Sequence, residues 1–219
     1  MSPLSGAPRP DRVRQTVRLV LGMTMLGVGV AGMLVADLGV APFDLLGAGI
    51  VARFGVGFTV AGLIIHVTAT AVACLARRRP RALPTLAVLL IGPVIDLALP
   101  GLRVLATVVP APLMLLAGLT LFAFGIALYL AAGIGEAPIE AVQLVLETRA
   151  GLPRAAARML IDVTGGTIGV LLGGPIGIGT AVLALATGPA VAGASRVLAG
   201  RGVRSTLPDP VGAPAAAEA

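Results

Sequence analysis

Three ionisable side chains stand within long apolar runs, where such residues are rare. His66 lies midway along one run, Asp162 lies in a later run, and Asp96 lies near the end of a third. Placing a charge in hydrocarbon costs at least about 2.5–3.5 kcal/mol, so such groups usually face other helices or water. We therefore interpret His66, Asp162 and Asp96 as a candidate substrate or ion pathway. The alternative is a satisfied polar contact between helices, with Asp162 hydrated near the membrane surface.

A short phrase containing a proline and an acid occurs twice. Residues 39–44 read GVAPFD and residues 135–140 read GEAPIE, 96 positions later. Proline suits the first position of a helix, and an acid suits the first turn because a helix N-terminus is positive. Each phrase therefore predicts a helix break followed by a short helix, near 43–53 and 139–149. The acids either stabilise these helices or line the two mouths of a cavity. The motif residues are Gly39, Pro42, Asp44, Gly135, Pro138 and Glu140.

The match at this offset extends beyond the two phrases. Residues 22–75 laid on 118–171 agree at 16 of 54 positions without a gap, which predicts two related halves. His66 corresponds to Asp162 at the same offset. Pseudo-symmetry then predicts that these two side chains approach each other near the axis that relates the halves.

Composition places these residues in a membrane. The chain of 219 residues is 57% hydrophobic and 12% charged, whereas a soluble domain carries about 25% charged residues. The apolar runs are continuous rather than alternating, which predicts helices and not barrel strands. Six runs are long enough to cross about 30 Å of hydrocarbon. They lie near 19–36, 57–76, 83–99, 113–132, 157–173 and 177–195.

The arginines select a topology, because cytoplasmic loops carry an excess of basic residues. With six spans, fourteen of the sixteen arginines lie inside, and only Arg53 and Arg103 lie outside. With eight spans the division is 12 to 4. Six spans give two inverted three-span halves, a plan that recurs in secondary transporters. We therefore expect an all-α membrane protein with six transmembrane helices as two inverted three-span repeats, each with one short interfacial or re-entrant helix, and both termini in the cytoplasm.

This topology predicts four regions. The ends are rich in Pro, Ser, Ala or Arg, which is typical of unfolded segments. The expected boundaries are a disordered cytoplasmic N-terminus at 1–12, membrane repeat 1 at 13–106, membrane repeat 2 at 107–200 and a disordered cytoplasmic C-terminus at 201–219.

Three stretches resemble a known family. ADLGVAPFDLL, TRAGLPRAAARMLIDV and LLGGPIGIGTAVLALATGP are similar to the YczE/YyaS/YitT-like bacterial integral membrane proteins, and most of all to the YczE branch. The resemblance runs from about Arg18 to Val197, and it implies a location in the bacterial cytoplasmic membrane. It implies no activity, since none is established for the family. Members tend to have a Gly-Pro-Arg-Asp-like phrase in the second repeat, where this chain has Glu136-Ala137-Pro138-Ile139-Glu140.

Two functional hypotheses follow. The first is a small secondary transporter or permease for an unknown small solute or ion. The second is a non-transporting membrane scaffold or regulatory protein that acts through a cytoplasmic partner. We expect no enzyme, cofactor or metal site, because the chain has one histidine, one cysteine and no nucleophile–base motif. The net charge of +6 comes from loop arginines, which indicates membrane orientation and not nucleic acid binding. The expected partner is the lipid bilayer, and a homodimer would enlarge the small volume that six spans enclose.

Overall fold

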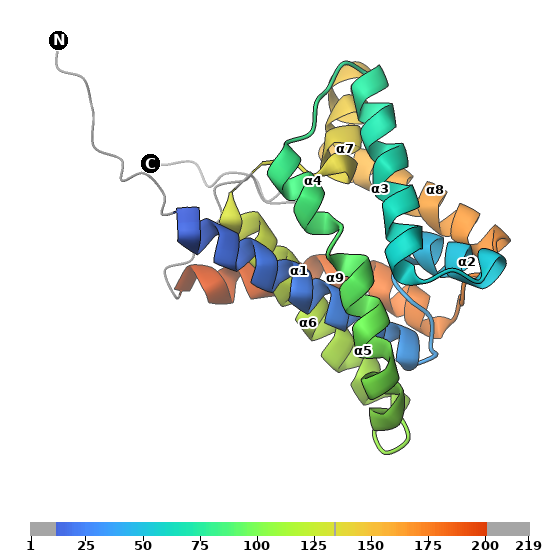
Figure 1. Ribbon diagram of the computed structural model, residues 1–219. Helices are drawn as coiled ribbons and strands as arrows, with labels where there is room; N and C mark the ends of the chain where they lie inside the picture. Colours follow the sequence, from blue (N-terminus) through green and yellow to red (C-terminus); the bar gives the residue numbers. More distant parts are fainter. Residues whose placement is uncertain (1–11, 134, 201–219) are drawn as a thin grey trace, which may run out of the picture.

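A computed structural model describes residues 12–133 and 135–200, and the regular structure in these ranges is helical. The sequence-based expectations of disorder for 1–12 and 201–219 fall outside the described residues, except that Arg12 begins the first helix. In chain order the helices are α1 (Arg12–Val35), α2 (Asp44–Phe54), α3 (Phe58–Leu75), α4 (Ala82–Val88), α5 (Ile91–Leu105), α6 (Ala111–Ala132), α7 (Pro138–Arg149), α8 (Arg154–Leu171) and α9 (Ile178–Gly200) (Figure 1).

Five helical segments of the described chain are long and apolar enough to cross a membrane. They are Arg12–Val35, Phe58–Leu75, Ala82–Leu105, Ala111–Ala132 and Ile178–Gly200. The third contains a break at residues 89–90 between α4 and α5, and it continues to Leu105, beyond the predicted end at 99. The fifth predicted run, 157–173, forms α8, which has 18 residues like α3. Its apolar character is lower because it carries Arg154, Arg158 and Asp162.

Glycines bring α1 and α6 into close contact. A Cβ on Gly22 would lie 2.9 Å from the carbonyl oxygen of Gly125. A Cβ on Gly29 would lie 2.7 Å from the carbonyl oxygen of Gly118. The earlier residue of α1 thus meets the later residue of α6, so the two helices are antiparallel. Small residues at such a crossing allow helix backbones to approach closely.

Left-handed backbone turns recur at a fixed spacing. The described residues with positive φ number eight, and they form four pairs that are each 96 positions apart. Helix bounds follow the same offset, because 58–75 of α3 corresponds to 154–171 of α8. The backbone therefore turns at the same places as the sequence match predicts. The pairs are Asp37 and Gly133, Gly39 and Gly135, Gly55 and Gly151, and Arg77 and Gly173.

Each short helix packs lengthwise on a long helix from the other half of the chain. Along α2, Phe43 faces Gly165, Leu45 contacts Gly169, and Ala52 lies near Gly173 at the end of α8. The positions rise together, so α2 runs parallel to α8. In the same way α7 packs on α3. The predicted short helices are thus present, with bounds within one residue of those expected.

Two groups contain all of the described helices except α4, which packs on α1. α1, α5, α6 and α9 pack together around a core that includes Val30, Met33, Leu119, Phe122 and Leu183. α2, α3, α7 and α8 form the second group, which lies to the upper right in Figure 1. The candidate polar residues His66, Asp162, Asp44 and Glu140 all belong to this second group.

Candidate functional site

Asp44 is the first residue of α2, and it lies against the middle of α8. Its Oδ2 atom is buried and has no hydrogen-bond partner among the described residues. On α8, Arg158 and Asp162 form an ion pair one helical turn apart, with Nε and Oδ1 separated by 3.1 Å. Burial raises the pKa of Asp44 to about 7, Arg158 opposes this rise, and Asp162 adds to it. Asp44, Arg158 and Asp162 therefore form one electrostatic cluster, which we call the α2–α8 cluster.

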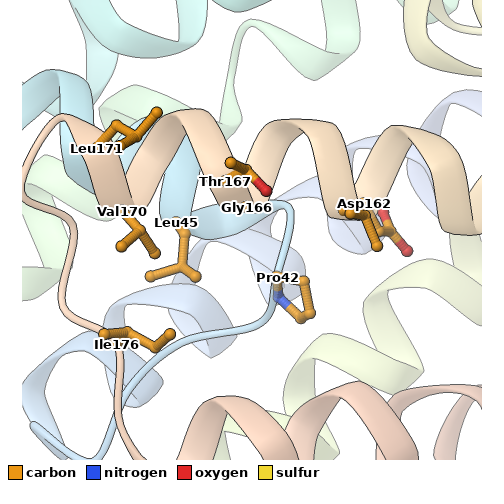
Figure 2. A pocket seen from close by; sticks show the side chains of 9 residues that line it. Pro42, Leu45, Asp162, Gly166, Thr167, Val170, Leu171 and Ile176 are labelled. Atoms are coloured by element: carbon orange, nitrogen blue, oxygen red, sulfur yellow. The ribbon is translucent and has the colours of Figure 1, made fainter.

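An open pocket of about 350 Å³ lies beside this cluster, between α8 and the segment that leads into α2 (Figure 2). Asp162 lies at one end of the pocket, and Leu171 and Ile176 lie toward the other. Pro42 and Leu45, which flank Asp44, form the wall opposite α8. The lining is mostly apolar, so the pocket suits the apolar part of a small molecule. Its volume is at the lower end of the range for ligand pockets.

Glu140 occupies the corresponding place in the other half. Its Oε2 atom is also buried and has no hydrogen-bond partner among the described residues. Its carboxyl group lies near the imidazole of His66 on α3 and the hydroxyl of Tyr129 on α6. His66 Nδ1 lies 2.7 Å from the carbonyl oxygen of Gly62. Because a carbonyl only accepts hydrogen bonds, Nδ1 carries the proton and Nε2 remains as the second ring nitrogen. We call Glu140, His66 and Tyr129 the α3–α7 cluster.

In each cluster, the acid comes from one half of the chain and the polar residue near it comes from the other half. Asp44 and Glu140 are equivalent at the offset of 96, and so are His66 and Asp162. Asp44 faces Asp162, and Glu140 faces His66. Each acid therefore lies opposite the polar residue of the other half. The structure brings His66 and Asp162 into separate clusters rather than into one shared pair.

Asp96 is engaged away from both clusters. Its carboxylate accepts hydrogen bonds from the Phe58 amide at 2.8 Å and from the Thr59 amide at 2.9 Å. The Thr59 hydroxyl donates a third bond at 2.6 Å. These are the first two residues of α3, whose free N–H groups need an acceptor. Asp96 therefore joins α5 to α3 as a helix cap.

The repeated glycines and prolines shape the loops before the two short helices. Gly39 and Gly135 have φ of 104° and 114°, a conformation that side-chain-bearing residues rarely adopt. Beside Gly39, the carbonyl oxygen of Leu38 accepts a 2.7 Å hydrogen bond from the amide of Gly179 at the start of α9. Pro138 is the first residue of α7, where a missing N–H has no cost. The loops are therefore fixed turns that aim Asp44 and Glu140 toward the facing helices.

Two residues of the clusters, Arg158 and Tyr129, are not among the site residues predicted from the sequence. The positive-inside pattern explains Arg158 as a loop arginine, whereas its spacing of four from Asp162 is the signal for an ion pair within a helix. Tyr129 is the only tyrosine in the chain, and a lone buried hydroxyl in an apolar helix signals a hydrogen-bonding role. Its hydroxyl lies 3.3 Å from the Ala137 amide, which donates to it. Within the described ranges no group of three or more His, Cys, Asp and Glu residues is placed to hold a metal ion.

Comparison with known proteins agrees with a membrane protein of unassigned activity. The sequence profile of a family of unknown function, DUF6198, matches residues 13–196. An uncharacterized membrane protein of Bacillus subtilis, YczE, is 27% identical over 173 residues, which cover 76% of this chain and 79% of that protein. No solved structure matches the chain significantly.

Proposed function

The chain belongs to the DUF6198 family of unknown function, and we propose that it is a small secondary transporter or permease. It is a membrane protein, as its apolar helices and its membrane relative indicate. We place it in a bacterial cytoplasmic membrane with both termini inside. The proposal is supported by the arrangement of the short helices and by the two buried acids that they carry.

Six spans in two inverted halves is the topology that we propose. The antiparallel contact of α1 with α6 supports it, since equivalent helices of inverted halves must run in opposite directions. α8 adds a sixth span to the five long apolar segments and is the fifth in chain order. Its Arg158–Asp162 ion pair reduces the cost of two charges in a spanning helix. The division of arginines, fourteen inside and two outside, supports the same orientation.

In this topology α2 and α7 are re-entrant helices. α2 runs along α8 from Gly165 to Gly173, so on this proposal its N-terminus lies deep and its C-terminus lies at the outer surface. On the other side, the Arg149 guanidinium at the end of α7 donates a hydrogen bond to the carbonyl oxygen of Ala76. Ala76 ends α3, so α7 reaches its surface at the cytoplasmic end. Short helices that enter from opposite faces are a known way to build transport sites.

The observation that carries the proposal is the pair of unpartnered buried carboxylate oxygens. Asp44 and Glu140 occupy equivalent positions at the deep ends of the two short helices. A buried carboxylate oxygen without a hydrogen-bond partner is costly, and it persists where it has a function. We propose that the two acids face the transport pathway from opposite sides. The pocket beside Asp162 is the place for the apolar part of the solute.

A scaffold remains the second candidate because of the exposed arginines at the cytoplasmic end. Arg77 and Arg79 follow α3, and Arg149 ends α7 beside them. A cationic surface of this kind suits an acidic partner protein or anionic headgroups. On this alternative, substitution of these arginines abolishes function and substitution of Asp44 and Glu140 does not.

Thiol labelling tests the proposal without knowledge of the solute. In a background with Cys74→Ser, single cysteines replace the equivalent exposed residues Ala52 and Thr148. We expect a membrane-impermeant reagent to label position 52 in intact cells and position 148 only in inside-out vesicles. Cysteines at 44 and 140 then report whether water reaches the deep ends, and we expect access to each from its own side. Labelling of 52 and 148 from one side refutes the inverted topology. Failure to label 44 and 140 from either side favours the scaffold.

A further inference from the structure

We propose that the α2–α8 cluster binds the coupling ion of transport, that the ion is a proton, and that Asp44 is the group that carries it. The inference rests on the proposed transport function and adds the identity of the ion. It stands on the placement of three charged side chains and on the difference between the two clusters.

The charges of the α2–α8 cluster do not balance when both acids are ionised. Arg158 supplies one positive charge, and Asp44 and Asp162 supply two negative charges. Arg158 is committed to Asp162, at 3.1 Å from Oδ1 and 3.2 Å from Oδ2. Asp44 is left with a buried Oδ2 to which no described residue donates a hydrogen bond. An ionised carboxylate in this position requires a positive species, either a proton or a cation.

The other charged groups near α2 do not supply that species. α2 packs on α8 and α3. On α8, Arg154 lies one turn before Arg158, and its Nε is buried without a hydrogen-bond partner among the described residues. Arg158 and Asp162, and not Arg154, are the charged groups that act on Asp44. On α3, His66 is influenced by Glu140 rather than by Asp44, and Cys74 is exposed. Arg158 and Asp162 are therefore the groups that set the state of Asp44.

The surroundings of Asp44 favour a proton over a metal cation. Sodium or another hard cation needs several oxygen ligands in a shell. The neighbours of Asp44 along α2 and its loop are Pro42, Phe43 and Leu45, and the facing surface of α8 is Gly165 and Gly169. Besides Asp44, the oxygens at this place are the Pro42 carbonyl, the Thr167 hydroxyl and the Asp162 carboxylate, which pairs with Arg158. This set is smaller than the shell that a hard cation needs, and Arg158 repels a cation. A proton needs no shell, and its addition to the carboxylate gives a neutral acid that suits an apolar site. The raised pKa of Asp44, at about 7, agrees with this choice.

Protonation has a simple effect on the cluster. When Asp44 is ionised, Arg158 is attracted to both Asp44 and Asp162. When Oδ of Asp44 gains a proton, one O–H bond forms, the carboxylate charge is lost, and Arg158 pairs with Asp162 alone. Loss of the proton reverses these changes. Because α2 and α8 carry the competing groups, proton binding biases the position of α2 against α8, which is the contact that must change for access to alternate.

The α3–α7 cluster provides an internal comparison. Glu140 has a buried unpartnered oxygen like Asp44, but it faces an imidazole and a phenol instead of an ion pair. The inference assigns the coupling proton to Asp44, so the equivalent change at Glu140 is the matched control for every experiment on Asp44.

The test uses dicyclohexylcarbodiimide, which modifies protonated carboxyl groups in apolar surroundings. The wild-type protein in lipid vesicles is treated at about pH 6 and about pH 9, with choline or sodium as the external cation. Trypsin then releases residues 19–53, in which Asp37 and Asp44 are the only acids. Fragmentation in the mass spectrometer separates the two sites, and the exposed Asp37 is the control within the same peptide.

We expect modification of Asp44 but not of Asp37, more than tenfold greater at the lower pH, as a group titrating near pH 7 requires. We expect sodium to have no effect. Absence of an adduct on Asp44 at both pH values overturns the inference, and so does protection by sodium, which identifies a metal cation site. Equal modification at the two pH values also contradicts it. The carbodiimide experiment tests the proton site, and the thiol experiment tests the transport pathway. If Asp44 is modified but position 44 is closed to thiol reagents, the proton site stands and the transport proposal fails. Failure of the inference can therefore be told apart from failure of the proposed function.

Discussion

Gly29 of α1 and Gly118 of α6 each leave room for the backbone of the other. The carbonyl oxygen of Gly118 would lie 2.7 Å from a Cβ on Gly29, and the carbonyl oxygen of Gly29 would lie 2.8 Å from a Cβ on Gly118. Both distances are shorter than a carbon–oxygen contact allows. The contact is reciprocal, as in a pair of surfaces related by a two-fold axis. The crossing of the two central helices therefore depends on the absence of side chains at these positions.

Gly29→Val and Gly118→Val are expected to destabilise the protein by at least about 1–3 kcal/mol each, because overpacking forces α1 and α6 apart. The measurement is thermal unfolding of purified protein in detergent. Gly193→Ala on α9 is the control, because a Cβ there meets no atom within 4 Å. An unchanged unfolding temperature in Gly118→Val would show that the helices do not cross at this point.

The stability of the folded protein is expected to fall as pH rises from about 4 to about 7. Burial raises the pKa of Asp44 from 3.8 to about 7, so the folded chain keeps a proton that the unfolded chain has already released. The free energy of unfolding then decreases with pH across this window, by up to about 4 kcal/mol. Asp44→Asn is expected to remove most of this decline, and Glu140→Gln is expected to keep it. The measurement is the unfolding temperature across a pH series. A decline of equal size in Asp44→Asn would refute the assignment to this residue.

Removal of Arg158 is expected to have a larger effect than removal of Asp162. Arg158→Leu leaves Asp44 and Asp162 facing each other without a positive charge, whereas Asp162→Asn leaves Arg158 to pair with Asp44. We expect Arg158→Leu to lower stability at about pH 8 by roughly 1–3 kcal/mol, a modest value because both side chains of the ion pair are partly exposed. The double variant Arg158→Leu/Asp162→Asn is expected to recover part of the loss. Additive losses in the double variant would contradict the shared electrostatic cluster.

Asp96→Ala is expected to destabilise the start of α3 by about 1–2 kcal/mol, because three hydrogen bonds to the first turn are lost. Thr59→Val is the graded control, since it removes the hydroxyl bond and keeps the two backbone bonds. Hydrogen exchange of the Phe58 and Thr59 amides measures the effect directly. We expect access of thiol reagents to position 44 to be unchanged. If Asp96→Ala changes the access of thiol reagents to position 44, Asp96 contributes to the transport pathway as well as to the start of α3.

The fold was largely predictable where the signal was local or repeated. The offset of 96 residues fixed in advance where the second short helix must begin, because proline, glycine and acid recur at known helix positions. The break at residues 89–90 has a local signal that hydropathy alone does not show: Pro93 has no N–H and its ring clashes with the carbonyl of Leu89, four residues earlier. Both parts, α4 and α5, pack on α1.

The sites were predictable as residues but not as partners. His66 and Asp162 stood out because ionisable residues in apolar runs are costly. Their partners come from helices far away in the chain, with Glu140 opposite His66 and Asp44 opposite Asp162. Pseudo-symmetry alone allowed either a shared pair or an exchange between halves. The choice depends on which helix each short helix packs against, and the periodicity of one sequence does not contain that information.

The exchange of partners between halves has a consequence for synthesis. α7 leaves the ribosome after α3, so it meets its long helix already made. α2 leaves the ribosome about a hundred residues before α8, and the glycine surface on which it rests does not yet exist. Domains and their parts fold in the order in which the ribosome delivers them. Two geometrically equivalent helices therefore gain their packing surfaces at different times, and the one that carries Asp44 gains its surface only after α8 has been made.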